Sequence, residues 1–511
     1  MNFRSTLIFL TLFMLSCELR QPKKNDATEE ETESVEEDTE QRKSESKCIV
    51  SECSVPREQG GLDPDPEIVP RYPELEPLTS TVPIFVVNTS KDSIGDEKVK
   101  STALVFGAEN GTGNFTGHDS HDHFNITIKL RGQTSRSYAK KSYSIDIVDK
   151  EGNNSEASIL GLPKEKDWVL YGPFADHTFF RNVLALELSR RTGEYAPRSK
   201  YINLYFNTEG RPEYGGVYLL MEKITRGKQR VDISKNPGYD PGGEEPYDGS
   251  FIFRIDPHDE NKLSFQTEMI GQSFDVVYPK KKNVHPYTAV WLRDQMVQVE
   301  SILRDESQLK SQAYARHIDV DNFINHYFIQ LITLDADGMW KSQYFHKDKG
   351  GPLRLGPVWD FNLAFDNYYF SQSRDRAHKN QIHFDGLGVW FRHLFKDPFF
   401  VERVQDRWKE LRGTEWSHSG LEDFINSNYE VLKKIEGQNF EKVSLGPLVR
   451  SENGDPATVF DLEFKFLRNF LLDRMCYLDT LLSGNGEHAE LFVKMDFSAR
   501  EGCPSGVSLT F

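Results

Sequence analysis

The apolar residues of this 511-residue chain change their spacing once, near Pro286. Before that point, short runs alternate between apolar and polar residues, as at Ile126, Ile128 and Leu130, which is typical of half-buried antiparallel strands. After it, apolar residues recur at helical spacing in longer runs. A sheet-rich first part and a helix-rich second part predict an α+β fold with two lobes. Clefts between lobes are preferred ligand sites.

The expected strands are 84–87, 103–106, 124–130, 142–148, 201–206 and 217–224. We expect Gly215 and Gly216 to turn the chain between the last two strands. A helix is predicted over 177–192, with Asp176 as its N-cap and Gly193 at its end. Further helices are predicted over 287–303, 320–334, 389–411, 421–435 and 460–482, with Asp319 or Asp321 capping the second of these.

Residues 1–17 are typical of a bacterial export signal. Arg4 supplies a short basic region, and the apolar run that follows is too short to span a bilayer. The run ends at Cys17, after a small residue, which resembles a lipobox in which the cysteine carries the lipid anchor. An ordinary cleaved signal peptide is the alternative, and export follows from either interpretation. We therefore expect an envelope or extracellular protein held to a membrane by its N-terminal lipid.

The segment 18–80 is expected to be a stalk. Its first half is rich in Glu, Ser and Thr and almost free of apolar residues, so it cannot bury enough surface to offset its chain entropy. Prolines are frequent in its second half, which should run extended. The folded domain is expected over 81–482, with lobes at about 81–285 and 286–482, and a tail over 483–511.

Whole-chain composition narrows the classes of function. Hydrophobic residues make up 37% of the chain, which is enough for a sizeable core. The formal charge of −17 argues against a nucleic-acid partner, because such partners are bound by clustered Lys and Arg. Besides Cys17, the cysteines are an even set that allows two disulfides, with the pairing left open: Cys48, Cys53, Cys476 and Cys503.

Two acidic segments lie where a helix or a strand should end. The first contains Asp335 and Asp337, directly after the helix predicted over 320–334. The second contains Asp360 and Asn362 among bulky apolar residues. Carboxylate and amide oxygens are ligands that Mg²⁺ prefers, and a carboxylate in apolar surroundings needs a cation or a donor. These segments suggest a metal site, although an Asp that caps a turn is an alternative at each place.

The acidic segments and three others together resemble the spore coat protein H (CotH) kinase family. The similar stretches lie in the family's order and span about 240 residues: 128–147, 174–193, 201–224, 317–338 and 355–367. The resemblance implies a two-lobed, atypical protein-kinase-like fold. It also implies ATP, a divalent cation such as Mg²⁺, and a protein substrate with a Ser or Thr acceptor.

Residue by residue, the resemblance implies roles for the acidic groups. Asp337 resembles the catalytic aspartate that orients and deprotonates an acceptor hydroxyl, and Asp335 is the alternative. Asp360 resembles the metal-binding aspartate, with Asn362 beside it. Such roles suit phosphoryl transfer, in which catalysis is mostly positioning and charge stabilisation.

The same resemblance suggests residues for the nucleotide. Lys141, or else Lys140, would neutralise the α- and β-phosphates, although both could be solvated strand ends. Arg131 would contribute to the turn over the phosphates, and the segment Met221, Glu222 and Lys223 resembles a hinge that binds adenine through its backbone. Arg181 and Asn182 could be structural or could reach the cleft.

The sequence departs from the family's pattern at two places. Ser342 and Gln343 stand where an Asn usually follows the catalytic Asp, so a second metal site is in doubt. Asp366 replaces the Gly after WDFNLAF, either as an added ligand or as a turn residue that tolerates a left-handed conformation. The loop 117–123, rich in His and Asp, is interpreted as a polar hairpin loop, with metal binding as the alternative.

Three functions compete on these residues. The leading hypothesis is an exported kinase that phosphorylates another envelope or surface protein. A kinase-like surface or assembly protein without activity is the alternative, because ATP is scarce outside the cytoplasm. A hydrolase that uses Asp337 and Asp360 as paired carboxylates is the third class, but no sugar cleft is evident from the sequence.

Overall fold

The computed structural model describes residues 78–107, 113–115, 122–236, 249–256, 259–285, 287–335, 337–367, 387–436 and 456–483. These residues belong to one compact unit, Gly61–Phe511. The unit contains both sheets and helices, which confirms the α+β class.

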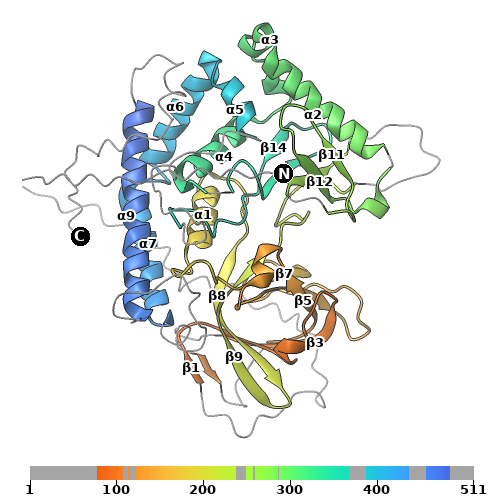
Figure 1. Cartoon of the computed structure of the whole chain (residues 1–511), viewed down its shortest axis with the longest axis vertical. Coiled ribbons are helices and arrows are strands. Elements are labelled where there is room, and N and C mark those ends of the chain that lie inside the picture. Colours follow the sequence, from red (N-terminus) through yellow and green to blue (C-terminus); the bar gives the residue numbers. More distant parts are fainter. Residues whose placement is uncertain are drawn as a thin grey trace, which may run out of the picture. The chain divides into compact units, whose positions relative to one another are not determined.

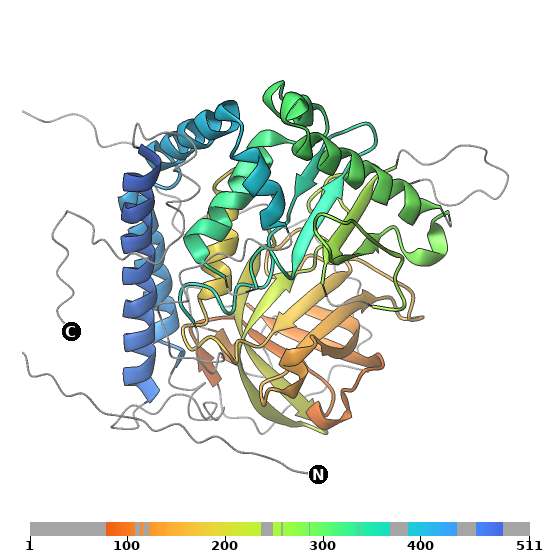
Figure 2. The same ribbon diagram turned by 45° about the horizontal axis from the view of Figure 1, so that its top comes forward.

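A closed barrel forms the first part of the unit, in place of an open sheet (Figures 1 and 2). Strands β2 and β8 pair in parallel and close the ring, with Ile84 opposite Asn203. The other barrel pairs are antiparallel. In barrel order the strands are β2 (Ile84–Val87), β3 (Val99–Phe106), β5 (Asp122–Arg131), β6 (Ser142–Val148), β7 (Asp167–Tyr171), β9 (Arg211–Glu222) and β8 (Ser199–Thr208).

Alternation along the barrel strands fills the interior. Tyr143 and Ile145 of β6 and Ile126 and Ile128 of β5 belong to one buried apolar cluster. These are the positions at which the sequence alternates, so each strand directs one side-chain row inward. Leu78–Ser80 (β1) pairs with Gly113–Phe115 (β4) as a separate two-stranded sheet.

A second, five-stranded antiparallel sheet combines strands from both predicted lobes. In sheet order its strands are β11 (Ser264–Gln266), β12 (Ser273–Tyr278), β10 (Phe251–Ile255), β13 (Gln343–Lys347) and β14 (Leu353–Leu355). Phe253 of β10 lies opposite Phe345 of β13, and their rings stack at 5.2 Å. Because this sheet crosses the predicted boundary at 285/286, a two-lobed arrangement is not confirmed.

The helices follow the predicted pattern with corrections at their ends. They are α1 (Arg181–Arg190), α2 (Thr288–Arg304), α3 (Glu306–Lys310), α4 (Val320–Thr333), α5 (Gly388–Leu394), α6 (Pro398–Gly413), α7 (His418–Lys433) and α9 (Pro456–Ser483). Figures 1 and 2 both show α7 and α9 side by side. Helix α4 is buried around its whole circumference from Asn322 to Thr333, and the Asp319 carboxylate caps it by accepting the Asn322 N–H at 3.0 Å.

Three local predictions were wrong for identifiable reasons. The turn before β9 lies at Glu209 and Gly210, because both have positive φ, whereas Gly215 and Gly216 lie within β9 at a register shift. The predicted helix 389–411 is broken before Pro398, which lacks a backbone N–H and starts α6 behind the Asp397 cap.

The start of α1 was also misplaced. The helix begins at Arg181 and not at His177, because Phe179 has a φ of +57°. The Asp176 carboxylate still accepts backbone N–H groups of this first turn, from Thr178 at 3.0 Å and Arg181 at 2.9 Å. Asp176 therefore stabilises the turn that precedes the helix.

Candidate functional site

Asp360 lies in the irregular segment 356–367 that follows β14. The residue is exposed and has a φ of +72°. Desolvation nevertheless raises the pKa of Asp360 from 3.8 to about 6, with opposing contributions from Arg131, which lowers it, and Asp337, which raises it. A carboxylate that protein largely surrounds is harder to ionise, because burial disfavours the charged form.

Asp337 contributes to the same electrostatic environment. It follows α4, which ends where Leu334 adopts a left-handed conformation with a φ of +44°. Its side chain is 35% exposed, and Lys341 Nζ lies 3.3 Å from its Oδ1. Besides Asp360, its charge acts on Tyr138, whose pKa is raised by desolvation and then by Asp360 and Asp337. Asp337 and Asp360 therefore act electrostatically on each other and on Tyr138, and their catalytic and metal-binding roles stay predictions.

Asp335 is more deeply buried than Asp337. Its side chain is only 7% exposed, at the buried end of α4. An acceptor hydroxyl approaching from solvent would reach Asp337 first. The geometry therefore favours Asp337 over the alternative, Asp335, as the group that faces a substrate.

Of the cations that act on Asp360, Arg131 lowers its pKa the most. Desolvation lowers the pKa of Arg131, and Asp360 and Tyr344 act in the opposite direction. Its guanidinium lies over the Trp359 ring, 5.1 Å from the centroid. This contact joins the end of β5 to the segment that carries Asp360, and it gives the cleft a fixed positive group.

Two further charged residues, Arg254 and Asp256, act on this site and were not predicted from the sequence. Arg254 of β10 donates to the Tyr344 hydroxyl at 3.1 Å and pairs with Asp256 at 2.9 Å. Desolvation raises the pKa of Asp256, and Asp337 contributes in the same direction. These residues lie on β10 and β13, whose pairing brings distant parts of the chain together. No local motif in the sequence marks such a pair.

The residues Arg181 and Asn182 hold the loop that carries Asp360. Asn182 Oδ1 accepts the Phe361 N–H at 2.8 Å, and Arg181 Nε donates to the Ala364 carbonyl at 3.2 Å. Arg181 is fully buried, with Asp176 and Glu463 as ion-pair partners. Of the two roles left open by the sequence, these contacts support the structural one.

Asn362 and Asp366 belong to the same loop. The Asn362 carbonyl accepts from Asn367 Nδ2 at 2.6 Å, and Asn367 Nδ2 also donates to the Ala175 carbonyl at 2.8 Å. Asp366 has a φ of +58°, so it serves as the left-handed turn residue that the sequence suggested as one alternative. The proposed metal role of the Asn362 side chain stays a prediction.

The two candidate lysines both donate to backbone carbonyls. Lys140 is buried and donates to the Val217 carbonyl at 2.5 Å, with its Nζ over the rings of Phe179 and Tyr218. Desolvation places the pKa of Lys140 well below its usual value. Lys141 Nζ donates to the Arg136 carbonyl at 2.5 Å. Arg131 is the cation that lowers the pKa of Asp360 most, and the phosphate-binding role of the lysines stays a prediction.

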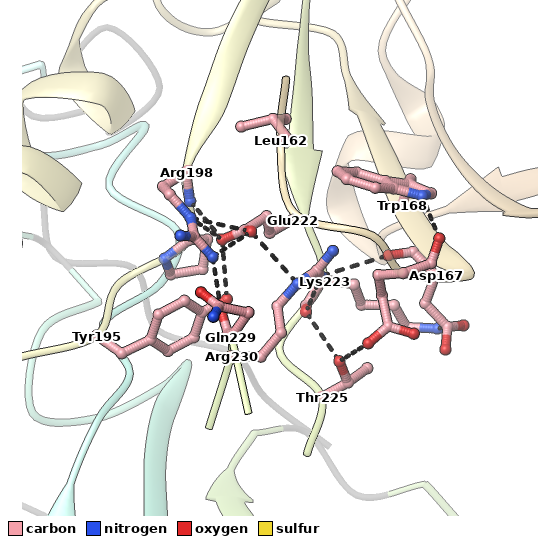
Figure 3. Close-up of polar contacts among 12 residues, drawn as sticks. Leu162, Asp167, Trp168, Tyr195, Arg198, Glu222, Lys223, Thr225, Gln229 and Arg230 are labelled. Carbon is pink, nitrogen blue, oxygen red and sulfur yellow. Dashed lines mark hydrogen bonds and ion pairs between the residues drawn. The ribbon is translucent and has the colours of Figure 1, made fainter. Parts of the chain in front are cut away.

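The hinge-like segment lies within the barrel. Met221 pairs with Val169 on one side and Ser199 on the other. Figure 3 shows the buried Glu222 carboxylate beside Arg198 and Arg230, at 2.7 and 3.4 Å. Lys223 pairs with Asp167 at 3.0 Å. These contacts give the three residues structural roles, so adenine binding by this segment stays an untested prediction.

The Ser342–Gln343 departure also has a structural consequence. Gln343 is buried, its Nε2 donates to the Lys341 carbonyl at 2.8 Å, and its Oε1 lies 2.8 Å from His326 Nε2. The side chain is thus engaged away from the acidic pair. A second metal ligand at this place finds no support in these contacts.

The donor set of the cleft fits one divalent cation bound together with phosphates. Within the described residues, no cluster of three or more His, Cys, Asp or Glu is arranged to hold a metal without other ligands. Mg²⁺ commonly uses one or two carboxylates and substrate phosphates. Desolvation first, and Asp337 in the same direction, raise the pKa of Asp360, and a nearby cation would favour its ionised form.

Some predicted features lie outside the described residues. These are Cys17, the stalk up to residue 77, most of the 117–123 loop, the tail after Ser483, and four of the five cysteines. The pairing of Cys476 therefore stays a prediction. Among the residues that the structure does describe, none of the helices has both the length and the apolar character needed to cross a membrane.

Comparison with known proteins agrees with the resemblance. A family model described as CotH kinase protein matches residues 128–478, from β5 to α9. The match contains Arg131, Asp337 and Asp360. A search of curated proteins found no match to this chain.

Proposed function

This chain belongs to the CotH kinase family, and we propose that it transfers the γ-phosphoryl group of ATP to Ser or Thr hydroxyls of an exported protein. Family membership supports a kinase-like protein, and the finer assignment is our proposal. One observation supports it: desolvation raises the pKa of Asp360, and Arg131 and Asp337, from two other segments of the family match, are the charged groups that act on it most.

Asp360 is proposed to hold a divalent cation in the cleft. When bound, that cation would neutralise charge that gathers on the phosphoryl oxygens. Asp360 suits this role because it is exposed to the entering nucleotide and fixed through its neighbour Phe361 by Asn182. Its position on a held loop reduces the reorganisation needed during transfer.

Asp337 is proposed to orient the acceptor hydroxyl. Its oxygen would accept the hydroxyl proton as the acceptor oxygen forms its bond to the γ-phosphorus and the bond to the β-bridging oxygen breaks. The partial exposure of Asp337 leaves room for a protein side chain, and Lys341 Nζ lies 3.3 Å from its Oδ1. General bases need hydrogen-bond reach to the proton first and a suitable pKa second.

Arg131 is proposed to contact the phosphates in place of the predicted lysines. Its guanidinium can donate two parallel hydrogen bonds to phosphate oxygens, and stacking on Trp359 fixes its plane. Arg254 lies in the same electrostatic neighbourhood, since it also lowers the pKa of Asp360. The positive charges of these two arginines would offset the repulsion between a bound triphosphate and the two carboxylates.

The location of the reaction is also part of the proposal. The signal-like residues 1–17 and Cys17 support export and lipid anchoring at the bacterial envelope. The acceptor would then be a protein that shares this compartment. A catalytically inactive, kinase-like assembly protein is the second candidate, because Gln343 stands buried where the family usually places a metal-binding Asn.

Phosphoryl transfer can be tested with the full chain, radiolabelled ATP and Mg²⁺ or Mn²⁺. We expect labelling of Ser or Thr in an envelope extract or in the chain itself, reduced at least about 100-fold by Asp337→Asn or Asp360→Asn. Asp294→Asn, an exposed position on α2, is the matched control and should label like the wild type. Equal labelling of all four proteins would exclude this site.

The same samples separate the two candidate functions. A nucleotide that binds the folded state raises the melting temperature by mass action. Nucleotide-dependent stabilisation of the wild type, lost in Asp360→Asn and accompanied by no labelling in any sample, would favour the inactive assembly protein. Stabilisation together with labelling would support the kinase.

A further inference from the structure

Helix α9 is the last helix in the described part of the chain, and it lies well beyond Asp337 and Asp360 in sequence. Figures 1 and 2 show it beside α7. Three of its side chains nevertheless reach the backbone on which the two aspartates lie, either directly or through one other side chain: Glu463, Phe470 and Arg474. One helix therefore contacts both acidic segments.

The end of α4 is capped by groups from two distant segments. The last carbonyls of a helix have no N–H partner within it. In α4, the Leu331 carbonyl accepts from Arg474 Nε of α9 at 2.8 Å, and the Thr333 carbonyl accepts the Phe365 N–H at 2.7 Å. A cation at the C-terminal end of a helix also interacts favourably with the helix dipole. These two bonds fix the point from which the chain runs on to Asp337.

The loop of Asp360 is connected to α9 through Arg181. Arg181 Nε donates to the Ala364 carbonyl at 3.2 Å, and Arg181 Nη2 lies 3.3 Å from Glu463 Oε2. A second carboxylate, that of Asp176, accepts from Arg181 Nη1 at 2.7 Å. Arg181 is fully buried and Glu463 is 8% exposed. A buried guanidinium is stable only where acceptors satisfy it, so Glu463 helps to fix the hydrogen bond that Arg181 gives to the loop.

Aromatic rings of α9 pack against the same loop and against the start of α1. Phe470 meets Phe365 of the loop edge to face, with 6.3 Å between the ring centroids. Phe464 stacks on Phe180, directly before α1, at 5.3 Å. Phe365 is buried and has a φ of +52°, an uncommon conformation that needs surrounding contacts to hold it. The apolar face of α9 therefore supports the loop and the first turn of α1 together.

We propose that α9 is a brace that sets the relative positions of Asp337 and Asp360, with Glu463 as the positioning residue. Glu463 acts through Arg181 on the loop of Asp360, and Arg474 of the same helix acts on the end of α4 that leads to Asp337. The spacing of the two aspartates then depends on α9 as well as on the segments that carry them. This inference rests on the proposed function, in which both carboxylates serve one phosphoryl transfer.

A purely stabilising role of Glu463 predicts a different result from a positioning role. Removal of a pair that only stabilises the fold raises hydrogen exchange throughout the cooperative unit. Removal of a positioning pair opens the backbone that Arg181 holds and leaves the rest protected. Residues 361–367 report on this difference, because the N–H groups of Phe361 and Phe365 in this stretch are hydrogen-bonded to α1 and α4.

Hydrogen exchange of the full-length protein, measured by mass spectrometry without nucleotide or metal, tests the brace. Glu463→Gln keeps the size of the side chain but removes its charge. Exchange of residues 361–367 should therefore rise at least about tenfold, while strands β5 and β6 exchange as in the wild type. Asp461→Asn is the matched control: it removes a pair between α9 and Lys433 of α7 at 2.8 Å and should leave the loop unchanged. Phe470→Leu, which removes the ring contact and no ion pair, should also raise exchange of the loop, and it decides the question if Glu463→Gln does not fold.

Phosphoryl transfer gives a second measurement. In a wild type that labels its substrate, Glu463→Gln should lower kcat about tenfold and change the KM for ATP less than about twofold, because altered spacing of the two aspartates disfavours the transition state more than nucleotide binding. A wild type that transfers no phosphate would count against the proposed function alone, since the exchange experiment needs no nucleotide. Unchanged exchange of the loop in the folded variants, a rise of equal size in the barrel strands, or an unchanged kcat in Glu463→Gln would each overturn the brace.

Discussion

Asn182 and Phe361 are joined by a hydrogen bond of 2.8 Å although 179 residues separate them in sequence. The bond connects the first turn of α1 to the residue directly after Asp360. Because Asp360 itself has a φ of +72°, its neighbours must hold the backbone in this uncommon conformation. The backbone position of Asp360 therefore depends on α1, which acts here through the uncharged side chain of Asn182.

Replacing Asn182 with Leu should loosen that loop. The change leaves the buried Phe361 N–H without an acceptor, which costs about 1–3 kcal/mol of unfolding free energy. We expect a lower melting temperature together with weaker phosphoryl transfer or nucleotide binding. Asn283→Leu, at an exposed turn position, is the control and should change neither. An Asn182→Leu protein with wild-type stability and binding would show that the bond is dispensable.

The raised pKa of Asp360 predicts a pH dependence of stability. In the folded state this pKa is about 6, against 3.8 normally, so the folded protein binds more protons between these values. Stability in the absence of cation should therefore fall as pH rises from about 4 through about 6. Asp360→Asn should lack this loss and melt higher than the wild type at pH 7.5 without metal.

Added Mg²⁺ provides the control for that pH experiment. If Asp360 binds the cation, Mg²⁺ with ATP should raise the melting temperature of the wild type at pH 7.5 and leave Asp360→Asn unchanged. Melting curves at pH 4.5, 6 and 7.5 measure both effects. Parallel curves for the two proteins at every pH would contradict the assigned environment of Asp360.

Arg131→Met should weaken ATP binding about tenfold or more. The change removes a charge-assisted phosphate contact, worth about 1.5–3 kcal/mol, and the stack on Trp359. It should also raise the pKa of Asp360 further, because Arg131 lowers it. Titration calorimetry with ATP measures the affinity. The matched control is Arg226→Met, whose guanidinium stacks on Tyr278 at 5.6 Å, and it should bind ATP normally.

Glu222→Gln should destabilise the fold by about 3–5 kcal/mol, because it leaves the buried Arg230 and the partly exposed Arg198 without their shared carboxylate. Denaturant unfolding measures this change. Glu187→Gln, which removes a partly exposed pair with Arg190, should cost about 1 kcal/mol or less. A Glu222→Gln protein that keeps its stability but loses ATP binding would instead support the hinge role that the sequence suggested.

Local patterns predicted much of the secondary structure because their physical causes are local. Strands β2 and β6 match their predicted bounds, and α4 matches within one residue, since alternation and the Asp319 cap act over a few residues. The break before Pro398 and the turn at Gly210 were missed where a second local signal competed. Asp337 and Asp360 were chosen from sequence, through two acidic segments in a known order, and their roles stay predictions.

The sequence by itself determined the α+β class and the family, because periodicity, helix caps and ordered motifs are local features of the chain. Only the tertiary structure decided that the first part closes into a barrel, that the charge of Arg131 acts on Asp360, and that Glu222 is buried in an ion-pair network. Such outcomes depend on strand pairing and side-chain burial between segments far apart in sequence, which no local pattern specifies.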